Sequence, residues 1–383
     1  MVKDKKYRIV YCTPALYMAG GVERVLTLKA NYFSEQLGYD ITIILTEGMN
    51  RPSFYPLSEK INVINLNLNF EELWHCSFLK KVFLYLKKQR QFKKMLTNEL
   101  MRLRPDITVS LLRREINFIT GIQDGSKKIG ELHINRANYR NFDARDSNFV
   151  KSIFSKYWMR NLVGKLKQLD RLVVLTEKDK DSWVELSNVV VIPDPLSFQP
   201  SSRSVLNRKR VVAVGRYSYE KGYDMLLAAW KSVSQKCPDW RLDIFGDGDK
   251  TSLEQLIDSL NIDRATCALH GRTADIEKEY VESSLFVCSS RFEGFGMVIV
   301  EAMACGLPVI SFDCPWGPGS IISDGKDGVL VENANVEALA DKIIQVLSAN
   351  DYMRELAQNA IDKSDKYKLQ SIMLKWKLLF ESL

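Results

Sequence analysis

Histidine is scarce in this chain, which contains only His75, His133 and His270 among its 383 residues. A zinc site made of several histidines is therefore disfavoured. The seven cysteines form no C-x-x-C pair, and several lie in apolar runs such as YRIVYC and LFVCSS. Cysteines in this setting are typical of reduced, buried thiols in a cytoplasmic protein, so we expect no disulfide framework.

Long apolar runs are also missing. No stretch of about 18 apolar residues occurs, so no membrane-spanning helix is expected. The first apolar run, YRIVYC, is too short and too β-branched for a signal peptide, and it favours a strand instead. These absences predict a protein that stays in the cytoplasm.

What the chain does contain is an alternation of apolar runs and helical segments. The runs expected to form strands are YRIVYC, DITIILTE, INVINL, DITVSLL, KKIGELHI, RLVVLT, VVVIPD, RVVAVG, WRLDIFG, CALHG, LFVCSS, PVISFD and GVLV. Segments with helical spacing, such as VERVLTLKANYFSEQLG and VEALADKIIQVLSAN, lie between them. This alternation predicts an α/β protein whose parallel sheets are covered on both faces.

Length and a break in the pattern divide the chain. A chain of 383 residues exceeds the usual size of a single core, so two domains are expected. Residues 194–209, DPLSFQPSSRSVLNRK, are rich in proline, serine and basic residues and show no periodicity. We therefore predict two doubly wound domains, 1–195 and 196–365, with a ligand site in the cleft between them.

The strongest chemical signal is the stretch SSRFEGFGMVIVEAMACGLPVI, residues 289–310. Its pattern predicts a helix from Gly296 to Cys305, whose unpaired N-terminal amides attract phosphate. Glu293 in the loop and Glu301 in the helix would then flank the diphosphate of a nucleotide-sugar, and each would accept hydrogen bonds from a sugar. The alternative is that Glu293 is a solvated loop acid and Glu301 an exposed helix acid.

A second stretch, VGRYSYEKGYDMLLAAW, places two cations at the end of a strand. Gly215 and Arg216 end the first strand of the second domain, and Lys221 begins the helix that follows. Both cations are expected at the carboxyl edge of the sheet, where they would neutralise a diphosphate that gains charge as it departs. The alternative is an ordinary surface arginine and a lysine at a helix start.

Three weaker signals lie in other loops. In LHGRT, the backbone at Gly271 would read a base edge and Arg272 would stack on the base, unless this is a plain turn. In TPALYMAGGVERVLTL, Gly20 and Gly21 predict a second glycine-rich helix start facing the cleft, or a flexible turn. His133 in GELHINR follows a strand and is a candidate for sugar contact or catalysis, or a structural histidine.

Together these stretches resemble retaining glycosyltransferase family 4, the large group 1 class. The pair Glu293-x7-Glu301 resembles the signature of that family, and AGGVERVL, VGRYSYEKGYDMLLAAW, FGDGD and LHGRT occur in its order and spacing. The resemblance covers almost the whole chain and is strongest from Val211 to Leu347. It implies a GT-B fold of two Rossmann-like domains with an intervening cleft. It also implies that residues 366–383 form a helix that crosses back to the N-terminal domain.

The resemblance implies roles for individual residues. Glu301 would bind the ribose, and Glu293 would contact the donor sugar. Arg216 and Lys221 would hold the diphosphate, and His133 matches the first-domain histidine that lies against the donor sugar. The other residues expected to bind the donor are Gly215, Gly271, Arg272, Gly294, Phe295, Gly296 and Met297.

The resemblance also bears on cofactors and on the type of polymer. Family members need no metal, so neither a metal nor a cofactor is expected, and Asp247 with Asp249 is interpreted as an incidental D-x-D match. The segment DCPWGPGSII resembles a variant seen in bacterial surface-polysaccharide transferases, such as those for lipopolysaccharide or capsule. Many of those have a glutamate where this chain has Ser320, which leaves the donor sugar open.

The expected reaction moves a hexose or N-acetylhexosamine from a UDP-sugar to an acceptor hydroxyl and keeps the anomeric configuration. Its transition state should resemble an oxocarbenium ion. Stabilising the departing diphosphate is then the main electrostatic task of the site. The residues expected to be catalytic are Glu293, His133, Arg216 and Lys221.

The acceptor is expected on the first domain, where residues 73–104 form a basic segment. Its cations are Lys80, Lys81, Lys87, Lys88, Arg90, Lys93, Lys94, Arg102 and Arg104, and its interleaved aromatic residues are Trp74, Phe78, Phe83, Tyr85 and Phe92. A basic helix with aromatic residues suits an anionic membrane surface, here the inner face of the plasma membrane, and would bring the enzyme to a lipid-linked glycan. The alternative is a solvated basic face; nucleic acid is disfavoured because no recognised binding module accompanies the segment.

Two other functions use the same features. One is a nucleotide-sugar epimerase or hydrolase with the same donor pocket. The other is a non-catalytic protein that binds a sugar nucleotide and docks on a membrane. A dehydrogenase is disfavoured because no strand is followed by the full dinucleotide-binding fingerprint.

Overall fold

The computed structural model describes residues 5–49, 51–136, 139 and 149–383. The chain divides into two compact units, one of residues 1–192 with 373–383 and the other of residues 193–372. The first division lies close to the expected limit at residue 195, and the second lies beyond the expected limit at residue 365. Each unit has its own sheet and its own hydrophobic core.

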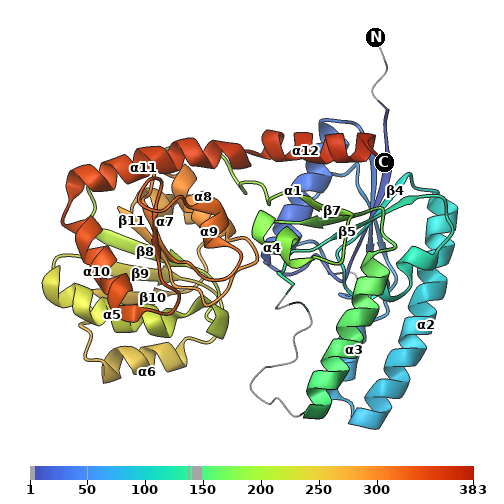
Figure 1. Cartoon of the computed structure of the whole chain (residues 1–383), viewed down its shortest axis with the longest axis horizontal. Coiled ribbons are helices and arrows are strands. Elements are labelled where there is room, and N and C mark those ends of the chain that lie inside the picture. Colours follow the sequence, from blue (N-terminus) through green and yellow to red (C-terminus); the bar gives the residue numbers. More distant parts are fainter. Residues whose placement is uncertain (1–4, 50, 137–138, 140–148) are drawn as a thin grey trace. The chain divides into compact units, whose positions relative to one another are not determined.

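The first unit is built on a seven-stranded parallel sheet (Figure 1). Its strands are β1 (Arg8–Thr13), β2 (Asp40–Leu45), β3 (Asn62–Asn65), β4 (Ile107–Ser110), β5 (Lys127–Glu131), β6 (Arg171–Val174) and β7 (Val189–Val191). Their order, β3-β2-β1-β4-β5-β6-β7, reverses between β1 and β4. In open parallel sheets, ligands bind beyond the carboxyl ends of the strands near such a reversal.

Helices cover both faces of this sheet. They are α1 (Gly21–Glu35), α2 (Phe78–Leu103), α3 (Phe149–Leu166), α4 (Glu177–Ser182) and α12 (Leu369–Glu381). Side chains alternate along a strand, so Val10 and Cys12 of β1 share one face. They belong to the same buried cluster as Phe92, Leu96 and Leu100 of α2.

The opposite face is covered by α1 and α12. The ring of Phe33 on α1 lies 5.4 Å from the ring of Phe380 on α12, and Phe380 also lies 6.3 Å from Tyr7 at the start of the sheet. Although α12 begins at Leu369 in the second unit, its residues from Met373 onward belong to the first. The last helix of the chain therefore supplies core side chains to the N-terminal unit.

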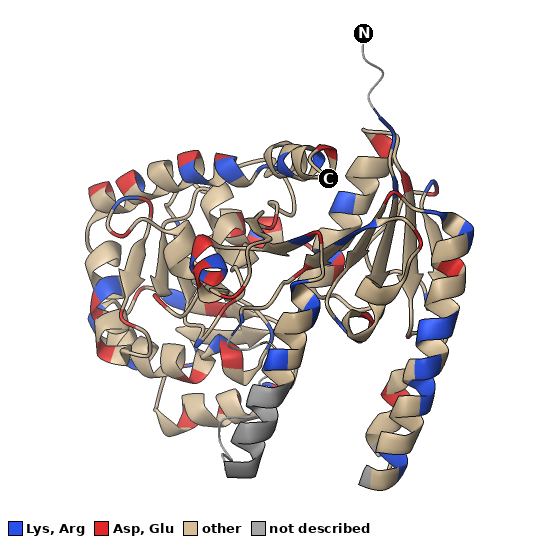
Figure 2. Cartoon of the chain, turned by 45° about the vertical axis from the view of Figure 1, so that its right-hand side comes forward, with Lys and Arg blue, Asp and Glu red and all other residues tan. Residues whose placement is uncertain are grey.

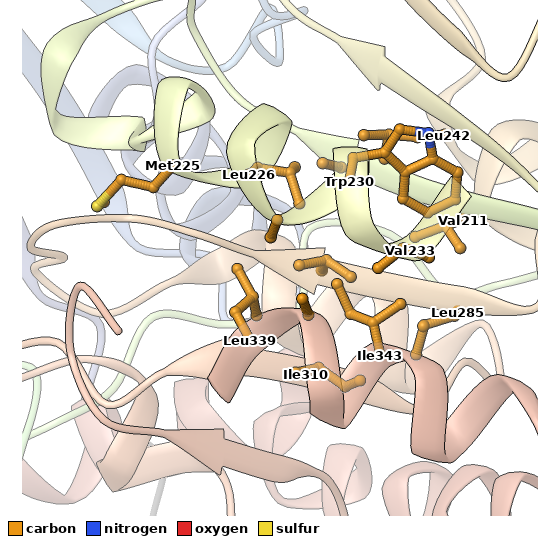
Figure 3. Packing of buried hydrophobic residues seen from close by; sticks show 14 of the residues in the cluster. Val211, Met225, Leu226, Trp230, Val233, Leu242, Leu285, Ile310, Leu339 and Ile343 are labelled. Atoms are coloured by element: carbon orange, nitrogen blue, oxygen red, sulfur yellow. The ribbon is translucent and has the colours of Figure 1, made fainter. Parts of the chain in front are cut away.

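The second unit is built on a six-stranded parallel sheet with the order β10-β9-β8-β11-β12-β13. Its strands are β8 (Arg210–Val214), β9 (Arg241–Phe245), β10 (Cys267–His270), β11 (Leu285–Cys288), β12 (Val309–Phe312) and β13 (Val329–Val331). Its helices are α5 (Tyr223–Lys236), α6 (Thr251–Ser259), α7 (Ile276–Val281), α8 (Met297–Ala304), α9 (Pro318–Ile321), α10 (Val336–Leu347) and α11 (Asn350–Ser364). Trp230 and Val233 of α5 pack with Ile343 of α10 in the largest part of its core (Figure 3).

The predicted doubly wound α/β architecture is confirmed. Each apolar run expected to form a strand overlaps one of the strands β1 to β13, and every pairing between these strands is parallel. The helix expected after Gly296 is also confirmed as α8. Among the described residues, no helix combines the length and the apolar character that crossing a bilayer requires.

Candidate functional site

The candidate site lies where the second sheet reverses its order, between β8 and β11. Two loops leave the carboxyl ends of these neighbouring strands: residues 215–222 connect β8 to α5, and residues 289–296 connect β11 to α8. The sequence predicts that Lys221 and Glu293 both lie at this edge, but it does so from two separate motifs. The structure brings the two side chains into direct contact.

Lys221 and Glu293 form a half-buried ion pair. The Lys221 Nζ atom lies 2.6 Å from Glu293 Oε1, and the two side chains are 17% and 12% exposed. Ser290 Oγ donates a second hydrogen bond of 2.6 Å to the same carboxylate oxygen. Burial lowers the pKa of Lys221, but the adjacent Glu293 carboxylate outweighs it and raises that pKa above its usual value. The lysine is therefore a fixed cation at neutral pH.

Backbone contacts hold the two loops together. Ser289 Oγ donates to the carbonyl oxygen of Lys221 at 2.9 Å, and the Arg291 amide donates to the carbonyl of Glu220 at 2.8 Å. Gly222 has a φ of +62°, and a Cβ atom there would lie 2.1 Å from the Ser289 carbonyl oxygen. Glycine is therefore required at the point where the loops approach most closely.

The N-terminus of α8 follows directly. Gly296 caps the helix with a φ of +103°, and Met297 is its first residue. Phe295 is buried, with its ring 5.5 Å from that of Tyr367. The ring anchors the loop from Glu293 to Gly296 against the core. The first amides of a helix lack partners within it, so this end can bind a phosphate group beside Lys221.

Glu301 sits deeper than either interpretation of the sequence expects. It is buried, and its carboxylate accepts a hydrogen bond from Ser197 Oγ on one oxygen and from the Tyr280 hydroxyl, at 3.2 Å, on the other. The alternative of an exposed helix acid is therefore wrong. The alternative of a solvated acid is also wrong for Glu293, which is paired with Lys221.

Arg216 is less constrained than Lys221. Its side chain is 74% exposed, and its Nη2 atom lies 3.0 Å from Glu220 Oε1 in the same loop. The backbone before it is fixed, because Tyr223 donates a hydrogen bond of 3.0 Å to the carbonyl of Gly215. The structure therefore places the backbone of Gly215 firmly and leaves the Arg216 guanidinium able to move.

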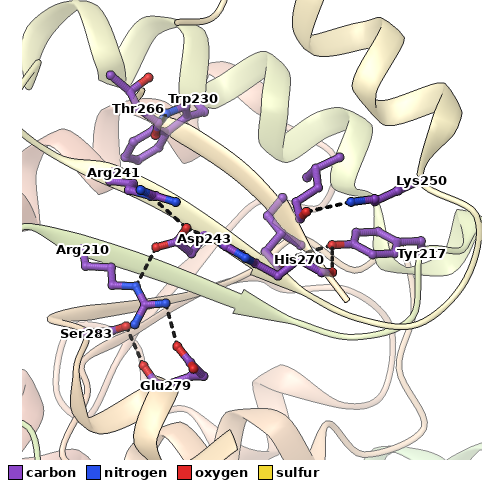
Figure 4. Close-up of polar contacts among 12 residues, drawn as sticks. Arg210, Tyr217, Trp230, Arg241, Asp243, Lys250, Thr266, His270, Glu279 and Ser283 are labelled. Carbon is purple, nitrogen blue, oxygen red and sulfur yellow. Dashed lines mark hydrogen bonds and ion pairs between the residues drawn. The ribbon is translucent and has the colours of Figure 1, made fainter. Parts of the chain in front are cut away.

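The loop expected to read a base follows β10. The Tyr217 hydroxyl donates to the carbonyl oxygens of Ile244 and His270, at 2.8 Å and 2.6 Å, and His270 Nε2 lies 2.6 Å from Asp243 Oδ1 (Figure 4). The ring of His270 also stacks on Phe245, with centroids 4.4 Å apart. The strand end before Gly271 and Arg272 is thus rigid. Both of these residues are exposed.

In the first unit, Gly21 begins α1 and Gly20 is its N-cap, as the sequence predicts. His133 follows β5 at the carboxyl edge, with its Nε2 atom 3.1 Å from Glu131 Oε1. Glu131 in turn forms an ion pair with Lys29 of α1. Lys29 and Glu131 are not among the residues that the sequence predicts for the site.

Other residues that support the site are also not predicted from the sequence. Ser197 and Tyr280 hold Glu301, and Ser290 holds Glu293. Serine and tyrosine carry no sign of such a role in a single sequence. The D-x-D match has a structural explanation, because Asp249 accepts hydrogen bonds from the amide and hydroxyl of Thr251 at the start of α6. No three His, Cys, Asp or Glu side chains are grouped to hold a metal ion in the part of the chain that the structure describes.

Comparison with known proteins identifies this arrangement. Residues 197–363 match the family described as "Glycosyl transferases group 1". These residues form a glycosyl transferases group 1 domain. The predicted family resemblance is thereby confirmed for the region that carries Lys221, Glu293 and α8.

Similarity to glycosyltransferases extends over the rest of the chain. An uncharacterized glycosyltransferase of Haemophilus influenzae is 29% identical over 94% of this chain and 96% of its own length. The amylovoran biosynthesis glycosyltransferase AmsD of Erwinia amylovora is 33% identical over 54% of this chain and 61% of its own length. The crystal structure of Anabaena Alr3699/HepE in complex with UDP and glucose covers 98% of this chain and all of its own, with a TM-score of 0.72 and 17% identity. The chain has the GT-B fold, and its second unit carries the glycosyl transferases group 1 domain.

Proposed function

We propose that this glycosyltransferase moves a hexose or N-acetylhexosamine from a UDP-sugar to a glycan acceptor in surface-polysaccharide biosynthesis, with retention of configuration. The observation that carries the proposal is the Lys221–Glu293 ion pair beside the N-terminus of α8. It offers a cation, helix amides and a carboxylate to the two halves of a nucleotide-sugar. The proposal is supported by the Haemophilus protein's name as a glycosyltransferase, by the Erwinia protein's part in amylovoran biosynthesis and by the UDP in the Anabaena structure.

The chemistry follows from charge. As the bond between the anomeric carbon and the phosphate oxygen breaks, negative charge grows on the diphosphate and positive charge grows on the sugar ring. Lys221, Arg216 and the first amides of α8 stabilise the diphosphate. Glu293 contacts the donor sugar. The acceptor oxygen bonds to the same face of the anomeric carbon, and its proton passes to the departing phosphate oxygen.

The rest of the site fixes the donor. Glu301 accepts hydrogen bonds from the ribose, while Ser197 and Tyr280 hold its carboxylate in place. The exposed loop at Gly271 and Arg272 lies against the base. His133 lies against the donor sugar. No metal takes part, so full activity in the presence of EDTA is expected.

The function is tested by incubating the full chain with a panel of nucleotide-sugars, with and without glycan acceptors, and analysing products by mass spectrometry. Transfer of a sugar with retained anomeric configuration is the expected result. Release of free sugar alone, or isomerised donor, would establish a hydrolase or an epimerase. Binding without any product would establish a non-catalytic sugar-nucleotide protein.

The ribose role of Glu301 is tested in the same assay. Glu301→Gln is expected to weaken UDP binding by about 10- to 100-fold, because a hydrogen bond to a charged group contributes about 1.5–3 kcal/mol. Isothermal titration calorimetry with UDP measures the effect, and thermal unfolding checks that the variant stays folded. A folded variant with unchanged UDP affinity would remove Glu301 from the donor site.

The proposal also includes a lipid-linked acceptor reached at an anionic membrane surface, through the first turns of α2. This helix extends past the carboxyl edge of the sheet in the first unit (Figure 1), and basic residues are spread along it (Figure 2). The first turns present Leu79, Val82, Phe83 and Leu86 at a spacing of three and four residues, all exposed. Exposed Lys80, Lys81 and Lys87 lie between them.

The proposed membrane-binding surface covers only the first turns of α2. The sequence suggests that Phe92 and Tyr85 face a membrane. Instead, Phe92 is buried in the core and Tyr85 packs against the core, so neither residue is available to a membrane. The side chain of Phe78 lies outside the described residues. Leu79 and Phe83, at 80% and 69%, are more exposed than Val82 and Leu86 on the same turns.

Membrane docking is tested with Leu79→Glu/Phe83→Glu. The double variant is expected to lose at least 10-fold in binding to vesicles that contain anionic phospholipid, because it removes inserted apolar area and adds negative charge near the lipid. Vesicle flotation at several salt concentrations measures the binding. The matched control is Val184→Glu, which changes another exposed apolar residue of the same unit. Equal flotation of the double variant and the control, or equal binding of wild type to neutral vesicles, would contradict the proposal.

A further inference from the structure

The first unit contains a fully buried lysine that the proposed reaction does not use. Lys29 lies on α1, in the face of the sheet covered by α1 and α12, and its Nζ atom pairs with Glu131 at the end of β5. Both side chains are at most 2% exposed. Lysine and glutamate are almost never buried to this extent unless they are paired.

Aromatic side chains enclose the ion pair. Lys29 Nζ lies 4.2 Å from the centroid of the Trp376 ring on α12 and 5.6 Å from that of Tyr11 on β1. Trp376 and Tyr11 are both buried. Cations are stabilised over aromatic faces, and the effect is larger away from water. Trp376 on the last helix of the chain thus covers the buried ion pair inside the first unit.

Structural stability alone does not explain the pair. Replacing a buried ion pair by apolar residues of similar volume is often neutral or stabilising. The surrounding face is apolar, with Phe33 and Phe380 packed nearby, so it would accept such a replacement. Buried charges of this kind are more common at functional sites, where they set the state of a neighbouring group.

The neighbouring group is His133. Its Nε2 atom lies 3.1 Å from Glu131 Oε1, the same oxygen that pairs with Lys29. A hydrogen bond from Nε2 to the carboxylate across this distance would fix the ring plane and, in the neutral ring, hold the proton on that nitrogen. Lys29 and His133 outweigh the effect of burial and hold the pKa of Glu131 at about 2, so the carboxylate stays ionised at neutral pH.

We propose that Glu131 is a positioning residue for His133 and that Lys29, covered by Trp376, compensates the charge of the buried Glu131 carboxylate. The inference rests on the proposed contact between His133 and the donor sugar. It goes beyond that contact because it assigns the orientation of the ring to a buried pair contributed by α1 and β5.

Two matched double variants separate positioning from stability. Lys29→Met/Glu131→Gln removes both charges but keeps an amide oxygen that can accept the hydrogen bond from His133. Lys29→Met/Glu131→Leu removes both charges and the acceptor. The first is expected to keep kcat within about 3-fold of wild type, while the second loses about 10- to 100-fold in kcat with little change in the KM of the donor, because a misplaced group is costly in the chemical step.

The ring itself is observed by NMR of nitrogen-15 histidine in the full chain, which has three histidines; His133→Asn identifies the signal by its loss. The proposal expects a protonated Nε2 in wild type and in the glutamine variant, and a mixture of tautomers in the leucine variant. If the leucine variant does not fold, Glu131→Asp takes its place, because the shorter acid stays near Lys29 but withdraws from His133. Wild-type His133 signals in the folded leucine variant, or in Glu131→Asp where it takes its place, would overturn the proposal.

The two measurements keep separate failures apart. If wild type shows no transfer with any donor, the proposed function fails, and the NMR signals still decide whether Glu131 orients the ring. If transfer is observed but both double variants have the same kcat and the same His133 signals, the proposed function stands and the positioning role is wrong.

Discussion

Lys221→Met is expected to lower kcat by roughly 100- to 1000-fold, the loss seen when one preorganised charge-stabilising group is removed from an active site. The variant removes the half-buried cation next to the N-terminus of α8, where the departing diphosphate gains charge. Steady-state kinetics with the donor found in the nucleotide-sugar screen measures the effect. The KM of the donor should rise much less, because most of the charge appears in the transition state.

Controls separate this loss from misfolding. Lys231→Met removes an exposed lysine from α5, the next element of the chain, and should leave kcat and thermal stability unchanged. Lys221→Met/Glu293→Gln removes both charges of the ion pair. This double variant should recover the thermal stability that the single variant loses, but its kcat should stay as low as that of the single variant. A single variant with wild-type kcat would show that Lys221 does not stabilise the leaving group.

The pH dependence of the same pair has a definite sign. The pKa of Lys221 is raised in the folded protein, so its ion pair contributes stability that is fully present below the unfolded value of about 10.4. That contribution is lost only as the pH rises through the raised pKa. Any loss of activity between pH 7 and pH 9 must therefore come from another group.

The strands and the course of α8 could be predicted because they depend on local pattern. Short apolar runs flanked by residues that favour turns, such as LFVC between two pairs of serines, form strands wherever a sheet is available. Gly296 and Gly306 bracket α8 because both have positive φ, at +103° and +80°. Glycine adopts such values without strain, so the helix limits are encoded within a few residues.

The contact of Lys221 with Glu293 could not be predicted in the same way. The two residues are 72 positions apart, and their contact depends on β8 and β11 being neighbours and on Gly222 allowing the loops to touch. The sequence pattern predicts only that each residue lies at the carboxyl edge of the second sheet. The burial of Glu301 likewise depends on Ser197, which lies 104 positions away.

A weak signal for Lys29 is present in the sequence. Val25, Leu26, Ala30 and Phe33 form the buried stripe of α1, and Lys29 falls within it at the expected spacing of three and four residues. A lysine on an apolar stripe is either at the margin of the buried face or paired within it. Its partner Glu131 ends the mostly buried strand β5, and only the packing of α1 on the sheet shows that the two residues meet.

Lys29→Met is expected to destabilise the first unit by about 3–5 kcal/mol at pH 7.5, because it leaves the Glu131 carboxylate buried without its cation. Urea unfolding followed by circular dichroism measures the loss. Lys29→Met/Glu131→Gln is the matched control, since it removes both charges and should recover most of the stability. A single variant as stable as wild type would show that Glu131 is not held as an ion in the folded chain.

This loss should shrink as the pH falls. In wild type the folded-state pKa of Glu131, about 2, lies below the unfolded value of about 4.3, so the stabilisation is present above pH 5 and declines as the pH falls towards 2. In Lys29→Met, burial without the cation should raise the folded-state pKa above the unfolded value, so the penalty at neutral pH is relieved by protonation. Protonation of His133 beside the carboxylate acts in the same direction. The difference in unfolding free energy between wild type and Lys29→Met should therefore be smaller at pH 5 than at pH 7.5, and a difference independent of pH would contradict an ionised, buried Glu131.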